Sequence, residues 1–259
     1  MRTDWLPQTA EIIESLSDAR FPSVLASALR DVVPFEFCVI FGYPAEAPPL
    51  TLHEDFPADR RRMHVADYQA GPYILDPFYV AGHNPEIRGL YRLSDIAPDR
   101  FYHGEYFRNY YAKTGLAEEI GYLVTVREDL ALVISLMRTE KRFSAVEVRH
   151  LAALWPVVEA ASRQHWKNLQ HPEDDQQGGI SDRIRTAFHS IGQGVLTSRE
   201  QEIVEHTLKG YSADATGKAL GISPGTVRIH RRNVYAKLRI SSQGELFSEF
   251  ISVIMAEKI

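Results

Sequence analysis

Hydrophobic and polar positions divide the chain into a mixed α and β first part and a helical second part. The first part has two stretches with helical spacing and three apolar, β-rich runs: 5–17 and 22–32, then Phe35–Tyr43, Ile120–Val126 and Leu130–Met137. The last two runs flank a charged turn, which predicts a β-hairpin. Residues 144–168 lack glycine and repeat apolar positions at helical intervals. We therefore expect one long amphipathic helix there, bent at Pro156.

In the second part, strand patterns disappear and helix caps become frequent. Side chains and glycines suited to helix starts and stops recur at short intervals: Thr197 with Glu200, Gly210, Ser212, Gly221, Ser223 before Pro224, and Ser242 with Glu245. They predict four short helices, with a tight glycine-containing turn between the second and the third. This is the pattern of a helix-turn-helix motif.

A polar segment, His171–Gly179, separates the two parts and shows no apolar periodicity, as expected of a linker. A length of 259 residues suits two domains. The predicted fold class is α+β. Residues 1–170 form an α/β/α sensor-like domain with a largely antiparallel sheet, 171–180 a linker, and 181–259 a four-helix helix-turn-helix domain.

Charge is distributed unevenly between the two parts. Residues 1–175 carry 18 Lys and Arg against 26 Asp and Glu, whereas 176–259 carry 11 against 8. The third predicted helix contains a basic cluster without an acid: Arg228, Arg231, Arg232, Lys237 and Arg239. Such a cluster is typical of a nucleic-acid contact, although a solvated cationic face has the same composition.

Projected on a helix, Val227, Val234 and Leu238 share the face that packs inward, with His230 beside them. Residues in the first half of a recognition helix reach base edges in the major groove of double-stranded DNA. The candidates for that role are Arg228, Ile229 and Arg232. The candidates for phosphate contacts are Ser223, Thr226, Arg231, Tyr235 and Lys237.

The run from Leu196 to about Phe247 resembles the LuxR-type helix-turn-helix domain through LTxRExE, GxS, LxIS, TVxxH and KL at fixed spacing. The resemblance implies that Thr226–Leu238 enters the major groove and that Ser242–Ile254 helps dimerisation. Thr216 and Gly217 replace the family's usual Ile-Ala pair, and Asp214 replaces a longer residue that is often basic or an amide. We expect Gly217 to cost about 0.5–1 kcal/mol relative to alanine.

Several classes of protein are excluded or disfavoured by what the first part lacks. No acidic pair follows Phe35–Tyr43, as a phosphorylated receiver requires, and neither a P-loop nor a G-x-S-x-G motif occurs. The single cysteine, Cys38, excludes an internal disulfide and a multi-cysteine zinc site, and its apolar run predicts a packed thiol. Apolar stretches are too short for a membrane span. We expect a cytoplasmic protein that is not an enzyme and has no cofactor.

Aromatic residues are concentrated in 68–111, where eight Tyr and three Phe make up 11 of 44 residues. So many hydroxyls suggest a polar-lined ligand pocket rather than a dry core. The candidate effector-binding residues are Tyr68, Tyr73, Asp76, Tyr102, Tyr106 and Tyr110, with Glu118 or Glu119, of which only one can face inward. Carboxylates among tyrosine rings favour an effector with an amine or amide N–H.

Two alternatives to this sensor stay open. Asp76-Pro77 is similar to the Asp-Pro motif of autoinducer-binding domains, but Trp5, Trp155 and Trp166 all lie away from it. An acyl-homoserine lactone is therefore a second candidate, and a ligand-free dimerisation or protein-interaction module is a third. In each case we expect a homodimer on a partly palindromic operator, paired through the helix 144–168 and through Leu246, Phe247, Phe250, Ile251 and Ile254.

Overall fold

The structure is a computed structural model that describes residues 6–45, 47–170, 188 and 190–256. The chain forms two compact units. The first comprises Met1–Val65, Phe78–Ile96 and Gly115–Asp174, and the second comprises Ala66–Pro77, Ala97–Thr114 and Asp175–Ile259. The predicted linker at 171–180 lies outside the described residues. Two segments from the N-terminal half thus pack with the helix-turn-helix region, a grouping that hydrophobic periodicity does not reveal.

The first unit is built on a five-stranded sheet in the order β2-β1-β5-β4-β3, in which every neighbouring pair is antiparallel. The strands are β1 (Phe37–Pro44), β2 (Leu50–Glu54), β3 (Gly89–Arg92), β4 (Glu118–Arg127) and β5 (Leu130–Arg138). The largely antiparallel sheet and its β4–β5 hairpin are confirmed. The two edge strands, β2 and β3, were not predicted because they are short and their partly exposed residues give little apolar signal.

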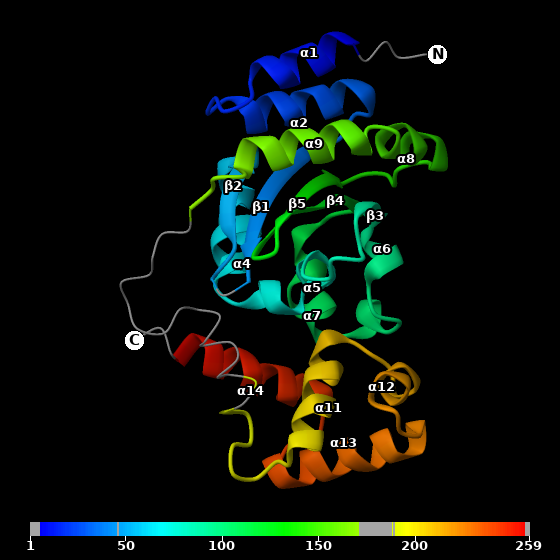
Figure 1. Ribbon diagram of the computed structural model, residues 1–259. Coiled ribbons are helices and arrows are strands. Elements are labelled where there is room, and N and C mark those ends of the chain that lie inside the picture. The colour runs from blue at the N-terminus through cyan, green and yellow to red at the C-terminus, as the bar shows by residue number, and fades with distance from the viewer. Residues whose placement is uncertain (1–5, 46, 171–187, 189, 257–259) are drawn as a thin grey trace. The chain divides into compact units, whose positions relative to one another are not determined.

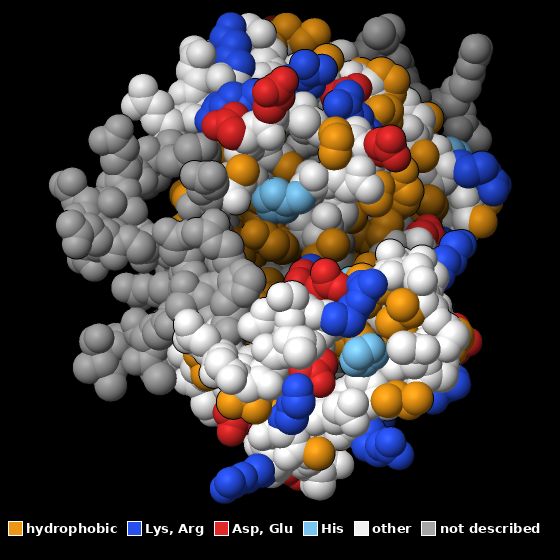
Figure 2. Space-filling view, turned by 60° about the horizontal axis from the view of Figure 1, so that its bottom comes forward, with side chains coloured by type: hydrophobic (Ala, Val, Ile, Leu, Met, Phe, Trp, Pro, Cys, Tyr) orange, Lys and Arg blue, Asp and Glu red, His pale blue; other side chains and the backbone are white. Residues whose placement is uncertain are grey.

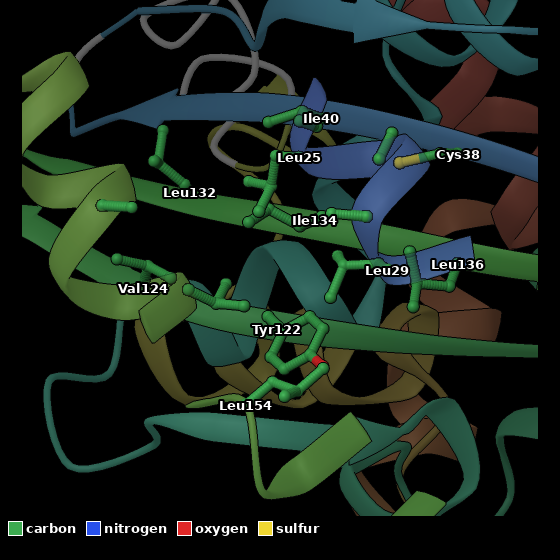
Figure 3. Packing of buried hydrophobic residues seen from close by; sticks show 14 of the residues in the cluster. Leu25, Leu29, Cys38, Ile40, Tyr122, Val124, Leu132, Ile134, Leu136 and Leu154 are labelled. Carbon is green, nitrogen blue, oxygen red and sulfur yellow. The ribbon is translucent and has the colours of Figure 1, made fainter. Parts of the chain in front are cut away.

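Helices α2 (Phe21–Val32) and α9 (Trp155–Trp166) cover one face of the sheet, and α1 (Leu6–Glu14) packs against both (Figure 1). Alternate residues of the central strands point into this layer and form the main core with α2, as Figure 3 shows for Ile40, Ile134 and Tyr122. The Tyr122 hydroxyl donates 2.7 Å to the Leu151 carbonyl, so its polar end is satisfied. Cys38 is fully buried there, and burial raises its pKa, which confirms the packed thiol.

The expected single helix over 144–168 is wrong. The structure has two helices, α8 (Ala145–Ala152) and α9, and Pro156 lies in the first turn of the second. Proline has no backbone N–H and its ring collides with the preceding turn, so it fits the start of a helix better than its interior. A separate capping box at Ser144 and Glu147 starts α8.

Short helical segments connect the strands of the N-terminal half. They are α3 (Ala58–Arg61), η1 (Arg62–Ala66), α4 (Asp67–Gln69), η2 (Pro72–Leu75), α5 (Pro77–Gly82), α6 (Leu93–Ile96), η3 (Phe101–His103), α7 (Glu105–Asn109) and η4 (Tyr111–Thr114). In the first unit, Phe78 of α5 lies against Gly121 of β4, where a Cβ atom would come within 2.7 Å of the Phe78 ring. Glycine at this strand position therefore admits the ring.

The second unit contains the four predicted helices of the DNA-binding module: α11 (Ser198–Lys209), α12 (Ala213–Leu220), α13 (Pro224–Leu238) and α14 (Gln243–Ala256). Thr197 and Glu200 form a capping box, and Ser212 and Ser223 cap α12 and α13. Gly210 and Gly221 end α11 and α12 in left-handed conformations. The four-helix prediction is confirmed because these signals are local in sequence and in space.

Candidate DNA-binding surface and effector site

The inward face of α13 holds this helix against α11 and α12. Val227 packs in a small core with Ile203 and Ala213, and Val234 is also buried. The predicted packing face is therefore present, and α13 is the second helix of the helix-turn-helix pair. His230 is half-buried beside this face, as expected.

The three predicted base-reading residues project from the opposite side of α13. The Arg228 side chain is 64% exposed and Ile229 is 52% exposed, and Arg232 is exposed as well. Figure 2, which brings α13 toward the viewer, shows Lys and Arg side chains around this helix. Arg228 lies 3.7 Å from Asp214 of α12, but both side chains are well exposed, so water screens this pair.

The five predicted phosphate contacts differ from one another in their exposure and in their contacts. The hydroxyls of Ser223 and Thr226 hydrogen-bond to each other across 2.8 Å, and the Ser223 hydroxyl caps α13 by accepting the Thr226 N–H. Tyr235 is half-buried. Arg231 donates across 2.8 Å to the Tyr211 carbonyl, and Lys237 donates across 2.7 Å to Glu200. The last two side chains therefore stabilise the module itself in this arrangement.

Gly217 is a correction to the sequence-based expectation. A Cβ atom at this position would lie 2.7 Å from the carbonyl oxygen of Ile222, in the turn between α12 and α13. The turn comes so close that the alanine usual in the family does not fit without a shift of the backbone. Gly217 is thus required by this packing, and the expected gain from alanine is wrong.

Four tyrosines of the second unit form a chain of ring contacts that begins beside Asp76. The Tyr68 hydroxyl donates 2.7 Å to Asp76, and the Tyr68 ring lies 6.1 Å from Tyr73 and 6.3 Å from Tyr110. Tyr106 stacks on Tyr110 with ring centroids 5.5 Å apart. Five of the predicted effector-binding residues, Tyr68, Tyr73, Asp76, Tyr106 and Tyr110, are therefore close together. We call them the tyrosine cluster.

Tyr102 does not belong to the tyrosine cluster. The spacing of Tyr102, Tyr106 and Tyr110 at every fourth residue predicts that they share one helical face, but that prediction is wrong, because Gly104 is extended and separates η3 from α7. Tyr102 is 44% exposed, whereas Tyr106 is buried. Regular spacing of four residues was a misleading signal at a place where glycine interrupts the helix.

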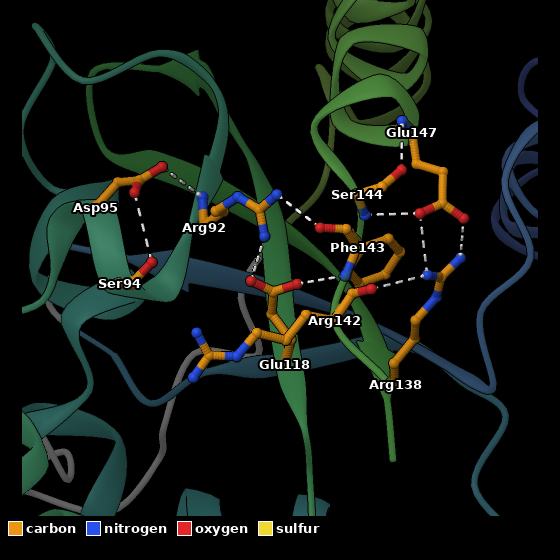
Figure 4. Close-up of polar contacts among 9 residues, drawn as sticks. All are labelled: Arg92, Ser94, Asp95, Glu118, Arg138, Arg142, Phe143, Ser144 and Glu147. Atoms are coloured by element: carbon orange, nitrogen blue, oxygen red, sulfur yellow. Dashed lines mark hydrogen bonds and ion pairs between the residues drawn. The ribbon is translucent and has the colours of Figure 1, made fainter. Parts of the chain in front are cut away.

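Glu118 and Glu119 occupy opposite faces of β4, as strand geometry requires. Glu118 is taken up by structural contacts: it forms an ion pair with Arg92 and accepts the Phe143 N–H across 2.5 Å (Figure 4). Glu119 is buried on the other face, opposite Met137 of β5. Of the two predicted carboxylates, Glu119 is the one whose side chain lies away from the helical core.

A cleft of about 510 Å³ lies elsewhere in the first unit, at the β4–β5 turn. Its charged and hydrogen-bonding lining residues are Tyr43, His83, Arg88, Thr125, Arg127, Glu128, Asp129 and Arg163. None of the predicted effector-binding residues lines it. In the sequence, this place is marked by the charged residues Arg127–Asp129. Their position between two strands already explains them as a hairpin turn, so they gave no reason to expect a binding site there.

Two negative findings concern the described part of the chain. No group of three His, Cys, Asp or Glu side chains there is arranged to hold a metal ion. No helix among the same residues is both long and apolar enough to cross a membrane.

A helix-turn-helix module that exposes arginines on its second helix defines a DNA-binding protein, and comparison with known proteins agrees. The family model for bacterial regulatory proteins of the luxR family matches residues 194–250. The chain is 32% identical over 191 residues to the HTH-type transcriptional regulator in the exeN 3' region of Aeromonas salmonicida, covering 71% of this chain and 97% of the relative. The chain belongs to the LuxR family of helix-turn-helix transcriptional regulators, and it is not an enzyme.

Two further similarities extend to the N-terminal part. The Klebsiella aerogenes monoamine regulon transcriptional regulator is 27% identical over 192 residues, which cover 68% of this chain and 75% of the relative. The crystal structure of the VqsR LBD domain from Pseudomonas aeruginosa matches with a TM-score of 0.54 and 26% identity, over 62% of this chain and 95% of that chain. The N-terminal domain is thus autoinducer-binding-like in fold.

Proposed function

We propose that this regulator binds a small effector with an amine or amide N–H in the tyrosine cluster, and that the effector controls sequence-specific DNA binding. The observation that carries the proposal is the Asp76 carboxylate, which lies among aromatic rings and is fixed by the Tyr68 hydroxyl at 2.7 Å. Such a carboxylate is positioned in advance, so binding costs little reorganisation.

The chemistry of the tyrosine cluster suits a cation or an amide better than a neutral hydrocarbon. A hydrogen bond from an ammonium to a carboxylate is about twice as strong as a neutral one. A cation over an aromatic face gains about 0.5–2 kcal/mol more. The similarity to a monoamine regulon regulator makes monoamines the first compounds to test. An acyl-homoserine lactone is the second candidate, since Asp76 can accept its amide N–H.

We further propose the organisation in which such an effector acts. Residues 1–170 sense the effector, 171–180 connect, and 181–259 bind the major groove of a partly palindromic operator as a homodimer in the cytoplasm. Leu246, Phe247 and Phe250 of the expected dimer face are buried within the second unit. Pairing therefore uses other surfaces or a rearranged α14.

Calorimetry of the full chain against monoamines, amino-acid amides and acyl-homoserine lactones tests the effector proposal. We expect one class to bind, with affinity reduced about tenfold or more in Asp76→Asn, which removes the charge and keeps the size. Arg88→Ala, in the cleft of the first unit, is the matched control and leaves affinity unchanged. Loss of binding in Arg88→Ala alone places the effector in the cleft, and no binding by any compound supports a plain interaction module.

A further inference from the structure

A carboxylate from the N-terminal half caps the first helix of the helix-turn-helix pair. Within the second unit, Asp99 Oδ1 accepts the backbone N–H of Ser212, the N-cap of α12, at 2.9 Å. Partial burial raises the pKa of Asp99, but the hydrogen bonds from Ser212 and the charge of Arg100 outweigh it and hold the pKa below its usual value. Asp99 therefore carries its negative charge at this helix end at neutral pH.

The backbone around Asp99 lies directly on the turn between α11 and α12. The Arg100 N–H donates 3.2 Å to the Gly210 carbonyl. Gly210 has a φ of 90°, and a Cβ atom on it would lie 3.2 Å from the Phe101 Cα atom. The Phe101 side chain itself is buried. Segment 97–105 is thus docked through backbone and side-chain contacts at one defined place.

The acids of this segment also lie near the recognition helix. Burial lowers the pKa of Arg231 and raises that of Tyr235, and the nearby charges of Asp99 and Glu105 each raise these two pKa values by a smaller amount. Both partners are predicted phosphate contacts of α13. Glu105 in addition lies against Gly244 of α14, 3.6 Å from the position a Cβ atom would take. Two carboxylates are therefore held beside the groups that are expected to meet the DNA backbone.

DNA phosphates need the same groups. When a helix-turn-helix module docks, its first helix crosses the DNA backbone, and backbone N–H groups at helix N-termini bind phosphate oxygens. A carboxylate oxygen bound to the Ser212 N–H occupies the place of such an oxygen. Its charge also repels neighbouring phosphates, an effect that is strong at low salt and screened beyond about 10 Å at 0.1 M salt.

We propose that segment 97–105 is a built-in inhibitor of DNA binding, in which Asp99 imitates a DNA phosphate at the N-terminus of α12. DNA and Asp99 compete for the Ser212 N–H, so the arrangement described here is incompetent for DNA and must release Asp99 to bind. This inference rests on the proposed function. It also links that function to the tyrosine cluster, because the segment continues into α7 and Tyr106. An effector regulates by binding the two arrangements with unequal affinity.

The test measures DNA affinity of the full chain without effector, on a duplex obtained by random-site selection with the same chain. We expect Asp99→Ala to bind about tenfold more tightly at low salt, since a hydrogen bond to a charged group contributes on that order. The gain shrinks as salt rises. Asp99→Asn, which keeps an acceptor but loses the charge, gives an intermediate gain. Glu140→Ala, an exposed acid of the first unit, is the charge-matched control and changes affinity less than about twofold.

The outcomes separate this inference from the function on which it rests. If Asp99→Ala melts like the parent chain yet binds selected DNA with equal or lower affinity, inhibition by segment 97–105 is overturned and the DNA-binding function stands. If Glu140→Ala raises DNA affinity as much as Asp99→Ala does, net charge explains the gain, and inhibition by segment 97–105 is overturned too. If neither the parent chain nor any variant selects a DNA sequence, both proposals fail.

Discussion

Lys237, near the end of the recognition helix, donates a hydrogen bond of 2.7 Å to Glu200, which closes the capping box at the start of α11. The Glu200 side chain is only 5% exposed and Lys237 is 37% exposed. Burial alone raises the pKa of Glu200, but the contacts with Lys237 and Thr197 together lower it by a larger amount. The pKa is therefore below its usual value, and the carboxylate stays charged. A residue expected to touch phosphate thus ties the last turn of α13 to the first turn of α11.

Replacing Lys237 with alanine should therefore lower the stability of the module. The change leaves a buried carboxylate without its cation, and we expect the free energy of unfolding to fall by about 1–3 kcal/mol. Urea unfolding measures it. Lys209→Ala is the matched control, because Lys209 forms an i,i+4 pair with Glu205 of the same helix, and its loss should cost about 0.3–0.5 kcal/mol. If Lys237→Ala instead leaves stability unchanged and makes the salt dependence of DNA binding flatter, Lys237 contacts a DNA phosphate.

Gly217→Ala should also destabilise the module, against the usual gain from alanine in a helix. Its Cβ atom would come within 2.7 Å of the Ile222 carbonyl oxygen, and displacing that turn costs about 1–3 kcal/mol. Gly225→Ala is the control, since its Cβ would meet only the Ser223 hydroxyl at 3.6 Å. We expect that control to gain about 0.5–1 kcal/mol from helix propensity. Thermal unfolding of both variants measures these changes. A higher stability in both would show that the turn between α12 and α13 shifts at little cost and would contradict the prediction.

The features that could be predicted from sequence are those whose partners are near in the chain. The caps at Thr197, Ser212 and Ser223 bond residues three positions away, and the nearly continuous apolar run of β5 reports its burial directly. The contact of Asp99 with Ser212 joins residues 113 positions apart, and no periodicity encodes it. The tyrosine cluster was predicted in part, because composition shows that aromatic rings gather but not that Gly104 turns Tyr102 away.

Glu147 gives the first unit a stability that depends on pH. Arg138, 2% exposed, binds this carboxylate at 2.8 Å and lowers the pKa of Glu147 to about 2 (Figure 4). In the unfolded chain the pKa of a glutamate is about 4.3, so on acidification the unfolded state takes up the proton first. The contribution of Glu147 is therefore complete above about pH 5 and is lost as pH falls toward 2.

Glu147→Gln should lower the free energy of unfolding by about 1–3 kcal/mol at pH 7. The difference from the parent chain should shrink steadily between pH 5 and about pH 3, because the parent loses the same interaction by protonation. Urea unfolding at a series of pH values measures it. Glu140→Gln, exposed in the loop before α8, should show no such trend. A difference that stays constant over this range would contradict the assignment to Glu147.

Base recognition should depend on Arg232 and Arg228 and not merely on their charge. Both project from α13 without burial, and an arginine that makes two hydrogen bonds to guanine contributes about 1–3 kcal/mol of discrimination against other bases. Arg232→Ala should therefore relax the preference at one position of each half-site in a random-site selection. Asp214→Asn, which removes the acid 3.7 Å from Arg228, should raise affinity for all sequences without changing the preferred one.

Lys218→Ala is the matched control for Arg232→Ala, because it removes one exposed cation from α12 at the same cost in net charge. A cation that contacts only phosphate affects all sequences alike, so Lys218→Ala should weaken binding uniformly or leave it unchanged. If Arg232→Ala likewise weakens binding without relaxing any position, Arg232 contacts the DNA backbone. Base reading in the first half of α13 then falls to Arg228 and Ile229, the other two side chains that the helix exposes there.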